Sequence, residues 1–244
     1  MVRLAHGHLT RLKGPLDRIE ARYGVARQIL VAIWARESAF GRASIPHDAL
    51  SVLATQAFMG RRRDMFAGEL LAALELLDRK EISRANLRSS WAGALGQPQF
   101  LPSKFLSYAV DGDGDGRRDI WRSEVDTLAS IANYLKSNGW RGGRDWGFEA
   151  RIPQSVSCAM EGPDRGMAID EWIALWVTRI SGRPFPDAER PLPGFMLIPA
   201  GRYGPAFIAT ENFYVLKTYN ETHLYALYIG HLADRMRWNN PIVA

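Results

Sequence analysis

The sequence contains one cysteine, Cys158, and no long apolar segment. A single thiol excludes an internal disulfide and a cysteine-based metal cluster, and we interpret Cys158 as a packing residue. No apolar run approaches the roughly 18 residues needed to cross a bilayer, so we expect no transmembrane segment. Internal repeats and low-complexity tracts are also absent. The 244 residues therefore form one large domain, or a core with a smaller insertion.

The N-terminus lacks the apolar stretch of a signal peptide. We therefore expect either that the protein stays in the cytoplasm or that its export signal lies outside this sequence. No zinc-finger spacing or aromatic RNA-binding strand is present, so we expect no nucleic-acid partner. The net charge is +5, and the isoelectric point is about 9.5. This charge favours a polyanionic partner, and an acidic cell-wall polymer fits it.

The apolar stretch at residues 29–41 is where we expect the chemistry. One face of the predicted helix contains Ile29, Ile33, Trp34 and Glu37. This face is apolar except for the carboxylate of Glu37 at its C-terminal end. Burial penalises the ionised form, so Glu37 is expected to hold its proton to higher pH, as a general acid in glycoside cleavage must. The alternative interpretation is a helix-end glutamate that reaches water beyond Gly41.

Helical periodicity dominates both ends of the chain, while the middle is rich in proline and glycine. We predict helices over 15–23, 28–37, 48–58, 63–77, 103–109, 123–139, 211–218 and 221–236. Asp48 and Ser103 are expected to cap two of these helices, Ser123 and Asp126 to form the capping box of a third, and Leu74 to face inward from the helix at 63–77. Between them, 148–152 and 195–198 favour strands and 170–180 a helix. The predicted fold is mainly α, with a helical core of residues 1–144 and 204–244 and a small inserted α+β subdomain of residues 145–203.

An acidic loop at residues 111–119 matches much of an EF-hand calcium loop. Asp111, Asp113 and Asp115 occupy its first carboxylate positions, and Arg117 stands where such loops contribute a backbone carbonyl. Arg122 replaces the usual final glutamate, so Glu124 or Asp126 would have to supply the last carboxylate. We expect a structural Ca²⁺, with a solvated acidic turn that binds no metal as the alternative.

Two further stretches have both a functional and a plain structural interpretation. Arg61 and Arg62 begin an arginine run at a predicted helix start, which is either a solvated face or a binding site for substrate carboxylates. Asn220 lies where one helix ends and the next begins, so it is an N-cap, a partner for sugar hydroxyls, or both. The loop at 91–103 is interrupted by glycine and proline but apolar, and we expect Trp91 to be buried there.

Several of these segments together resemble the lytic murein transglycosylases of the membrane-bound lytic transglycosylase B type. The similarity runs from about residue 10 to residue 237 in the same order of motifs. It is carried by Ala-Arg-Glu-Ser-Ala-Phe-Gly at 35–41, Ser-Trp-Ala-Gly-Ala-Leu-Gly-Gln-Pro-Gln-Phe-Leu-Pro-Ser at 90–103, the acidic loop ending in Ile120-Trp121, Ala-Asn-Tyr-Leu at 132–135 with Gly139-Trp140, and Tyr219-Asn220 with Tyr225.

The resemblance implies a lysozyme-like helical core and peptidoglycan glycan strands as the substrate. It also implies non-hydrolytic cleavage of the β-1,4 bond between N-acetylmuramic acid and N-acetylglucosamine, with a 1,6-anhydromuramoyl end as the product. No catalytic cofactor is implied, the periplasm follows from the substrate, and a monomer is the default expectation. Transferred to this chain, the family's functional residues are Glu37 as the catalytic acid and, for substrate binding, Ser90, Gln99, Arg61, Arg62, Tyr219, Asn220 and Tyr225.

The residues themselves are compatible with a mechanism that uses one carboxylate. Glu37 protonates the glycosidic oxygen, and the muramoyl O6 hydroxyl then attacks its own anomeric carbon, so neither water nor a second carboxylate is needed. Asp48 is the nearest downstream candidate for the second carboxylate of a lysozyme-type hydrolase. Two rival hypotheses are a non-catalytic peptidoglycan-binding scaffold and a calcium-responsive interaction module.

Overall fold

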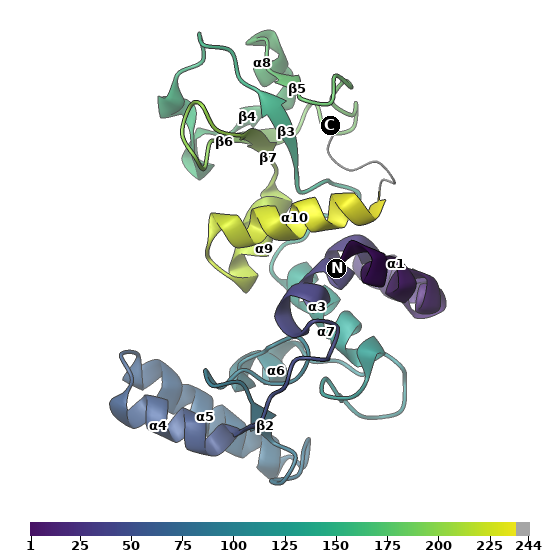
Figure 1. The fold of residues 1–244 in the computed structure, drawn as a ribbon, viewed down its shortest axis with the longest axis vertical. Coiled ribbons are helices and arrows are strands. Elements are labelled where there is room, and N and C mark those ends of the chain that lie inside the picture. The colour runs from purple at the N-terminus through teal and green to yellow at the C-terminus, as the bar shows by residue number, and fades with distance from the viewer. Residues whose placement is uncertain (238–244) are drawn as a thin grey trace. The chain divides into compact units, whose positions relative to one another are not determined.

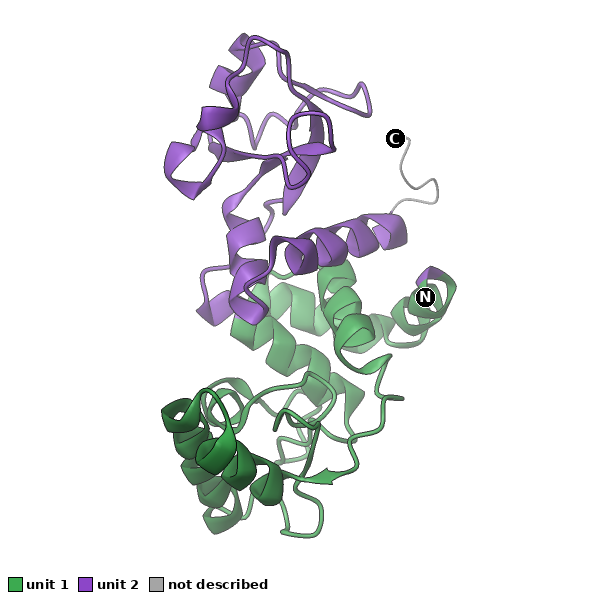
Figure 2. Cartoon of the chain, turned by 60° about the vertical axis from the view of Figure 1, so that its left-hand side comes forward, with its two compact units in different colours: residues 1, 3–134 green, residues 2, 135–244 purple. Residues whose placement is uncertain are grey.

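The computed structural model describes residues 1–237, and its fold is mainly helical, as predicted (Figure 1). The chain divides into two compact units, one of residues 1 and 3–134 and the other of residues 2 and 135–244 (Figure 2). Every helix among the described residues is too short or too polar to cross a bilayer. The helices are α1 (Val2–Arg11), α2 (Lys13–Tyr23), α3 (Arg27–Ser38), α4 (Ala49–Met59), α5 (Arg63–Asp78), α6 (Pro102–Tyr108), α7 (Glu124–Ser137), α8 (Ile169–Ala174), α9 (Glu211–Tyr219) and α10 (His223–Arg237).

The second unit contains a five-stranded antiparallel sheet with the strand order β4-β6-β7-β3-β5. Its strands are β3 (Gly147–Arg151), β4 (Met167–Ala168), β5 (Thr178–Arg179), β6 (Pro193–Leu197) and β7 (Ala206–Ala209). The core beside the sheet includes Phe148, Trp172 and Ile208, all nearly inaccessible to water. A two-stranded pair, β1 (His47–Asp48) and β2 (Arg88–Ser89), lies in the first unit.

Helix α3 is the central element of the first unit. Residues 29–35 are all buried, so the helix is enclosed on every side rather than on one face only. Strong helix formers such as Leu30, Ala32 and Ala35 stand beside the β-branched Ile29, Val31 and Ile33, and burial of this apolar surface stabilises the helix more than its propensities do. The predicted span of 28–37 is confirmed to within one residue at either end.

The prediction for α5 placed the helix correctly but rotated its buried face. Leu74, expected inside, is exposed, whereas Glu69 is buried. The Glu69 carboxylate accepts hydrogen bonds from the Ser103 backbone N at 2.9 Å and from Ser103 Oγ at 2.6 Å. Glu69 therefore satisfies an N-terminal amide of α6 from outside that helix, and the prediction that Ser103 itself caps α6 is wrong.

The prediction of one helix over 170–180 is half right. Helix α8 ends at Ala174, Trp176 adopts a left-handed backbone with φ of 64°, and Thr178 then begins β5. The pairing of β5 with β3 replaces the second half of the expected helix and gives the backbone groups of this segment partners in the sheet. The predicted strands at 148–152 and 195–198 are confirmed as β3 and β6, each shifted by one or two residues.

The boundaries of an inserted subdomain at 145 and 203 stay a prediction. Residues 238–244, with which the predicted helical core ends, lie outside the described residues.

Candidate active site

Glu37 lies in the last turn of α3, between the exposed Arg36 and the buried Ser38, and is itself half-buried. The chain leaves the helix through three successive residues with positive φ: Ala39 at 50°, Phe40 at 62° and Gly41 at 76°. A carboxylate is thus presented at the end of a helix whose residues 29–35 are all buried, and it is itself partly accessible to solvent. This is the setting expected of a side chain that exchanges a proton with a bound substrate.

Asp48 is held by structural contacts instead. One oxygen of its carboxylate accepts hydrogen bonds from the Ser51 backbone N and Oγ, both at 2.8 Å, and the other pairs with Arg84. The Arg84 guanidinium and the Ser51 amide hold the pKa of Asp48 well below its usual range. Asp48 is therefore the N-cap of α4 and an ion-pair partner, which leaves it little freedom to act as a second catalytic carboxylate.

The loop at residues 90–101 folds back on itself beside α3. Leu95 and Phe100 exchange backbone hydrogen bonds of 2.6 and 3.1 Å, and Ser90 Oγ accepts one from the Ala94 N at 3.2 Å. Gln99 has a positive φ of 54°, and its side-chain Nε2 donates to the Gly96 carbonyl at 2.9 Å. The loop is therefore held by its own hydrogen bonds, with Ser90 and Gln99 half-buried at its edges.

Trp91 corrects an expectation about this loop, because its side chain is 73% exposed rather than buried. An apolar composition predicts burial only on average, and large apolar side chains also occur on the surface. The adjacent Leu95 and Phe100 supply the buried part of the loop instead.

Gln97 was not among the predicted site residues. Its Oε1 accepts a hydrogen bond of 2.7 Å from Trp34 Nε1, and its Nε2 donates to the Trp121 carbonyl at 3.1 Å. The structure thus brings the end of α3 together with the 90–101 loop through Gln97, whereas the Gln99 side chain donates to a carbonyl of its own loop. Nothing in the spacing of the two glutamines distinguishes them, so the sequence carried no signal for this role.

Arg61 and Arg62 lie in the exposed connection between α4 and α5, and Arg62 is the N-cap residue of α5. No ion pair to either guanidinium occurs within residues 1–237. Two cationic groups beside a helix N-terminus form a positive surface that suits carboxylates.

The remaining predicted binding residues belong to the second unit. The rings of Tyr219 and Tyr225 stack with centroids 6.2 Å apart and planes 8° apart. Asn220 is exposed, and its Oδ1 accepts hydrogen bonds from the backbone N and Oγ1 of Thr222. Thr222 Oγ1 in turn accepts from the Tyr225 N at 3.2 Å, so Thr222 is the N-cap of α10 and the N-cap interpretation of Asn220 is wrong.

The acidic loop brings three carboxylates together. One oxygen from each of Asp111, Asp113 and Asp115 lies within 4.8 Å of the other two. The Asp111 carboxylate also accepts hydrogen bonds from the backbone N of Gly114 at 2.6 Å and of Gly116 at 2.8 Å. These amides lower the pKa of Asp111, and they hold the loop in a turn that points its oxygens inward.

The carboxylates expected to complete a metal site make other contacts. Asp126 is buried, and its two oxygens accept hydrogen bonds from the backbone N of Gly112, Asp113 and Asp119. Glu124 forms an ion pair of 2.7 Å with Arg11. Of the capping box predicted for α7, the bond from the Asp126 N to Ser123 Oγ is present, while the Asp126 side chain turns to the loop.

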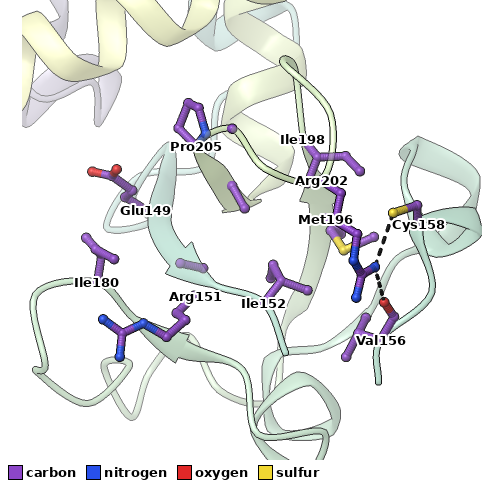
Figure 3. Close-up of a pocket in the computed structure, with 13 residues that line it drawn as sticks. Glu149, Arg151, Ile152, Val156, Cys158, Ile180, Met196, Ile198, Arg202 and Pro205 are labelled. Atoms are coloured by element: carbon purple, nitrogen blue, oxygen red, sulfur yellow. Dashed lines mark hydrogen bonds between the residues drawn. The ribbon is translucent and has the colours of Figure 1, made fainter. Parts of the chain in front are cut away.

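A separate cavity of about 250 Å³ lies in the second unit beside β3, β6 and β7 (Figure 3). None of the predicted site residues lines it. Arg202 crosses one side, where its Nη1 donates to the Val156 carbonyl at 3.0 Å and contacts Cys158 Sγ at 3.3 Å. Cys158 is exposed, so its interpretation as a packing residue is wrong.

Comparison with known proteins decides which family these features belong to. Residues 2–234 match the family described as "Transglycosylase SLT domain". The chain belongs to this family. The resemblance to the membrane-bound lytic transglycosylase B type is thereby confirmed, together with a mainly α, lysozyme-like fold.

Individual relatives support this assignment to the Transglycosylase SLT domain family. It is 40% identical over 126 residues to "Membrane-bound lytic murein transglycosylase B" of Escherichia coli (strain K12), covering 51% of this chain and 35% of the relative. The crystal structure of SltB3 from Pseudomonas aeruginosa with NAG-NAM-pentapeptide superposes with a TM-score of 0.94 at 39% identity, covering 100% of this chain and 65% of that one. Escherichia coli Slt35 in complex with calcium gives a TM-score of 0.81 at 28% identity, covering 97% and 74%. The chain therefore spans about a third of the curated relative and about two thirds of SltB3.

Proposed function

We propose that this chain is a lytic transglycosylase that cleaves the β-1,4 bond between N-acetylmuramic acid and N-acetylglucosamine in peptidoglycan and leaves a 1,6-anhydromuramoyl end. The observation that carries the proposal is the half-buried Glu37 at the end of α3, whose residues 29–35 are all buried, in a chain whose other candidate, Asp48, is bound to Arg84 and Ser51. Support comes from SltB3, for which structures with NAG-NAM-pentapeptide and with NAG-anhNAM-pentapeptide exist.

In the proposed reaction Glu37 acts first as an acid and then as a base. Its carboxyl proton passes to the glycosidic oxygen as the bond from that oxygen to the muramoyl anomeric carbon breaks, and N-acetylglucosamine leaves with a hydroxyl. The muramoyl O6 then bonds to the anomeric carbon, and its proton passes to the Glu37 carboxylate. The enzyme regains its starting state without consuming water, and the internal nucleophile benefits from a high effective concentration.

The first unit supplies four binding residues in this proposal. Ser90 and Gln99 bind saccharide, since both stand at the edge of a rigid loop with polar atoms partly open to solvent. Arg61 and Arg62 bind carboxylates of the substrate, because two exposed guanidinium groups without an ion pair in residues 1–237 lose no existing partner on doing so.

The second unit supplies Tyr219, Asn220 and Tyr225. The exposed Asn220 keeps its amide N–H donors for a sugar hydroxyl, because only its Oδ1 is used by Thr222. Tyr225 is largely buried against the stacked ring of Tyr219, which fixes the orientation of both phenols.

The acidic loop binds a structural Ca²⁺ in this proposal, and catalysis needs no cofactor. The inward oxygens of Asp111, Asp113 and Asp115 and the backbone carbonyl of Arg117 are hard donors that suit this ion. Asp126 stabilises the loop through three backbone amides. Titration with CaCl₂ should raise the melting temperature of the wild type, and Asp113→Asn should remove most of this increase.

The protein acts as a monomer on peptidoglycan glycan strands in the periplasm. The positive net charge of +5 agrees with an anionic polymer as its substrate. The name of the curated relative, a membrane-bound murein enzyme, agrees with the cell envelope as its location.

Digestion of purified sacculi followed by mass spectrometry of the released fragments tests the proposed function. We expect fragments with anhydro ends, lighter by one water than the products of hydrolysis, and loss of their release in Glu37→Gln. Reducing-end muramic acid as the main product would instead indicate a lysozyme-type hydrolase. Binding to sacculi without any release would indicate a scaffold.

A matched control for Glu37→Gln is Glu75→Gln, which makes the same chemical change on the exposed surface of α5. Glu75 forms an ion pair with Arg79, four residues further along the same helix. This variant should digest sacculi like the wild type.

A further inference from the structure

The turn that follows Glu37 has an unfavourable backbone conformation. Ala39 and Phe40 both have positive φ, at 50° and 62°, before Gly41 continues the left-handed run at 76°. Each non-glycine residue in this region costs roughly 1–2 kcal/mol, so the conformation persists only because surrounding contacts stabilise it. These contacts fix the end of α3 and therefore the backbone from which Glu37 extends.

One set of contacts comes from α3 and α1. Ser38 Oγ accepts a hydrogen bond of 3.0 Å from the Gly41 N and donates to the Trp34 carbonyl at 3.3 Å. The Phe40 ring stacks on His8 at 4.5 Å and meets Trp34 edge-on at 5.3 Å. These contacts close the turn but leave its position relative to the 90–101 loop open.

Gln97 supplies the contact with that loop. It is only 8% exposed, and its carboxamide uses both ends, since Oε1 accepts from Trp34 Nε1 and Nε2 donates to the Trp121 carbonyl. Its backbone N also donates to the Ile120 carbonyl at 2.9 Å. The carboxamide lies so close to Gly41 that a Cβ added there would be 2.5 Å from Oε1.

Gln97 thus lies against the chain on both sides of Glu37, at Trp34 within α3 and at Gly41 in the turn that follows the helix. Trp34 precedes Glu37 by three residues, and Gly41 follows it by four. We propose that Gln97 is the positioning residue of Glu37: its carboxamide fixes the C-terminal turn of α3 against the 90–101 loop and so sets where the catalytic carboxyl lies. The inference rests on the proposed role of Glu37.

Gln97→Leu tests this inference because leucine fills similar space but makes neither hydrogen bond. We expect kcat to fall about 10- to 100-fold, the range that misplacement of a catalytic group by about 1 Å produces. KM should stay within about two-fold of the wild type, because Gln97 is buried and positions the acid rather than the sugar.

Ser130→Ala is the control for loss of stability alone. Ser130 is fully buried in the same unit and accepts one hydrogen bond from the N of the half-buried Val110, so its substitution also removes the partner of a backbone amide. This variant should lower the melting temperature while leaving kcat unchanged. If Gln97→Leu lowers the melting temperature to the same degree and kcat stays at the wild-type value, the inference is wrong.

Gln97→Glu adds a readout that a purely structural role would not change. A glutamate at this position accepts from Trp34 Nε1 in either protonation state, but donates to the Trp121 carbonyl only when protonated. The ratio of its kcat to the wild-type kcat should therefore rise as the pH falls. A ratio that stays flat from pH 4.5 to pH 8 contradicts the inference, including when Gln97→Leu does not fold.

Glu37→Gln, measured alongside, separates the two possible failures. If Glu37→Gln keeps its activity, the proposed function itself is wrong. If Glu37→Gln is inactive but both Gln97 variants keep the wild-type kcat, only the positioning role is wrong.

Discussion

Replacement of Asp234 by asparagine should make the second unit more stable at high pH. Asp234 Oδ2 accepts a hydrogen bond of 3.0 Å from Trp146 Nε1, beside a second carboxylate, Asp145. Burial, and then repulsion from Asp145, raise the pKa of Asp234 to about 7. Asparagine keeps an oxygen for the indole N–H but carries no charge at any pH.

The sign and size of the effect follow from proton linkage. Between about pH 4 and pH 7 the folded state holds a proton on Asp234 that the unfolded state has released. The stability associated with this proton is complete below about pH 4 and is lost as the pH rises to 7. The full shift corresponds to at most about 4 kcal/mol, and partial solvent access reduces the expected effect to about 1–2 kcal/mol.

Urea denaturation at pH 5 and pH 8, followed by tryptophan fluorescence, measures this difference. The gain in free energy of unfolding on going from wild type to Asp234→Asn should be about 1 kcal/mol larger at pH 8 than at pH 5, because about a third of the stability associated with the proton is already lost by pH 5. Asp187→Asn, at an almost fully exposed carboxylate, is the control and should show no such pH dependence. The same gain at both pH values would refute the reasoning.

Three other substitutions test how the first unit is held together. Ala39→Gly should raise the free energy of unfolding by about 0.5–1 kcal/mol in urea, since glycine relieves the left-handed backbone at the end of α3, and a loss would contradict this. Glu69→Ala should lower the free energy of unfolding by about 1–2 kcal/mol because the Ser103 N loses its acceptor, whereas Glu69→Gln should lower it less. Equal losses for the two variants would argue against Glu69 as the cap of α6. Asp126→Asn should lower the free energy of unfolding by about 1 kcal/mol, because one side-chain oxygen can no longer accept a backbone N–H. It should also weaken Ca²⁺ binding in a calorimetric titration. Unchanged Ca²⁺ affinity would mean that the acidic loop orders without Asp126.

The sequence was informative where one local pattern decides the structure. The apolar run before Glu37 predicted α3, and Asp48 was identified as the N-cap of α4 from its type and place alone. The alternating aspartates and glycines of the acidic loop likewise predicted a turn with converging carboxylates. In each case neighbouring residues supply the physical reason, so no distant contact is needed.

Distant contacts explain what the sequence did not reveal. Ala39 and Phe40 have no preference for left-handed backbone, so only Gly41 hinted at the turn after Glu37. Gln97 and Gln99 stand in the same loop, and only the fold shows that Gln97 reaches Trp34. The buried face of α5 was misjudged because the partner of Glu69, Ser103, lies 34 residues away.

Digestion of sacculi in ¹⁸O-labelled water tests most directly whether Glu37 transfers a proton without activating water. If the muramoyl O6 is the nucleophile, the new ends contain only substrate oxygen, and mass spectrometry should find no label in them. Incorporation of ¹⁸O at the muramic acid end would show that water attacks the anomeric carbon and would contradict the account.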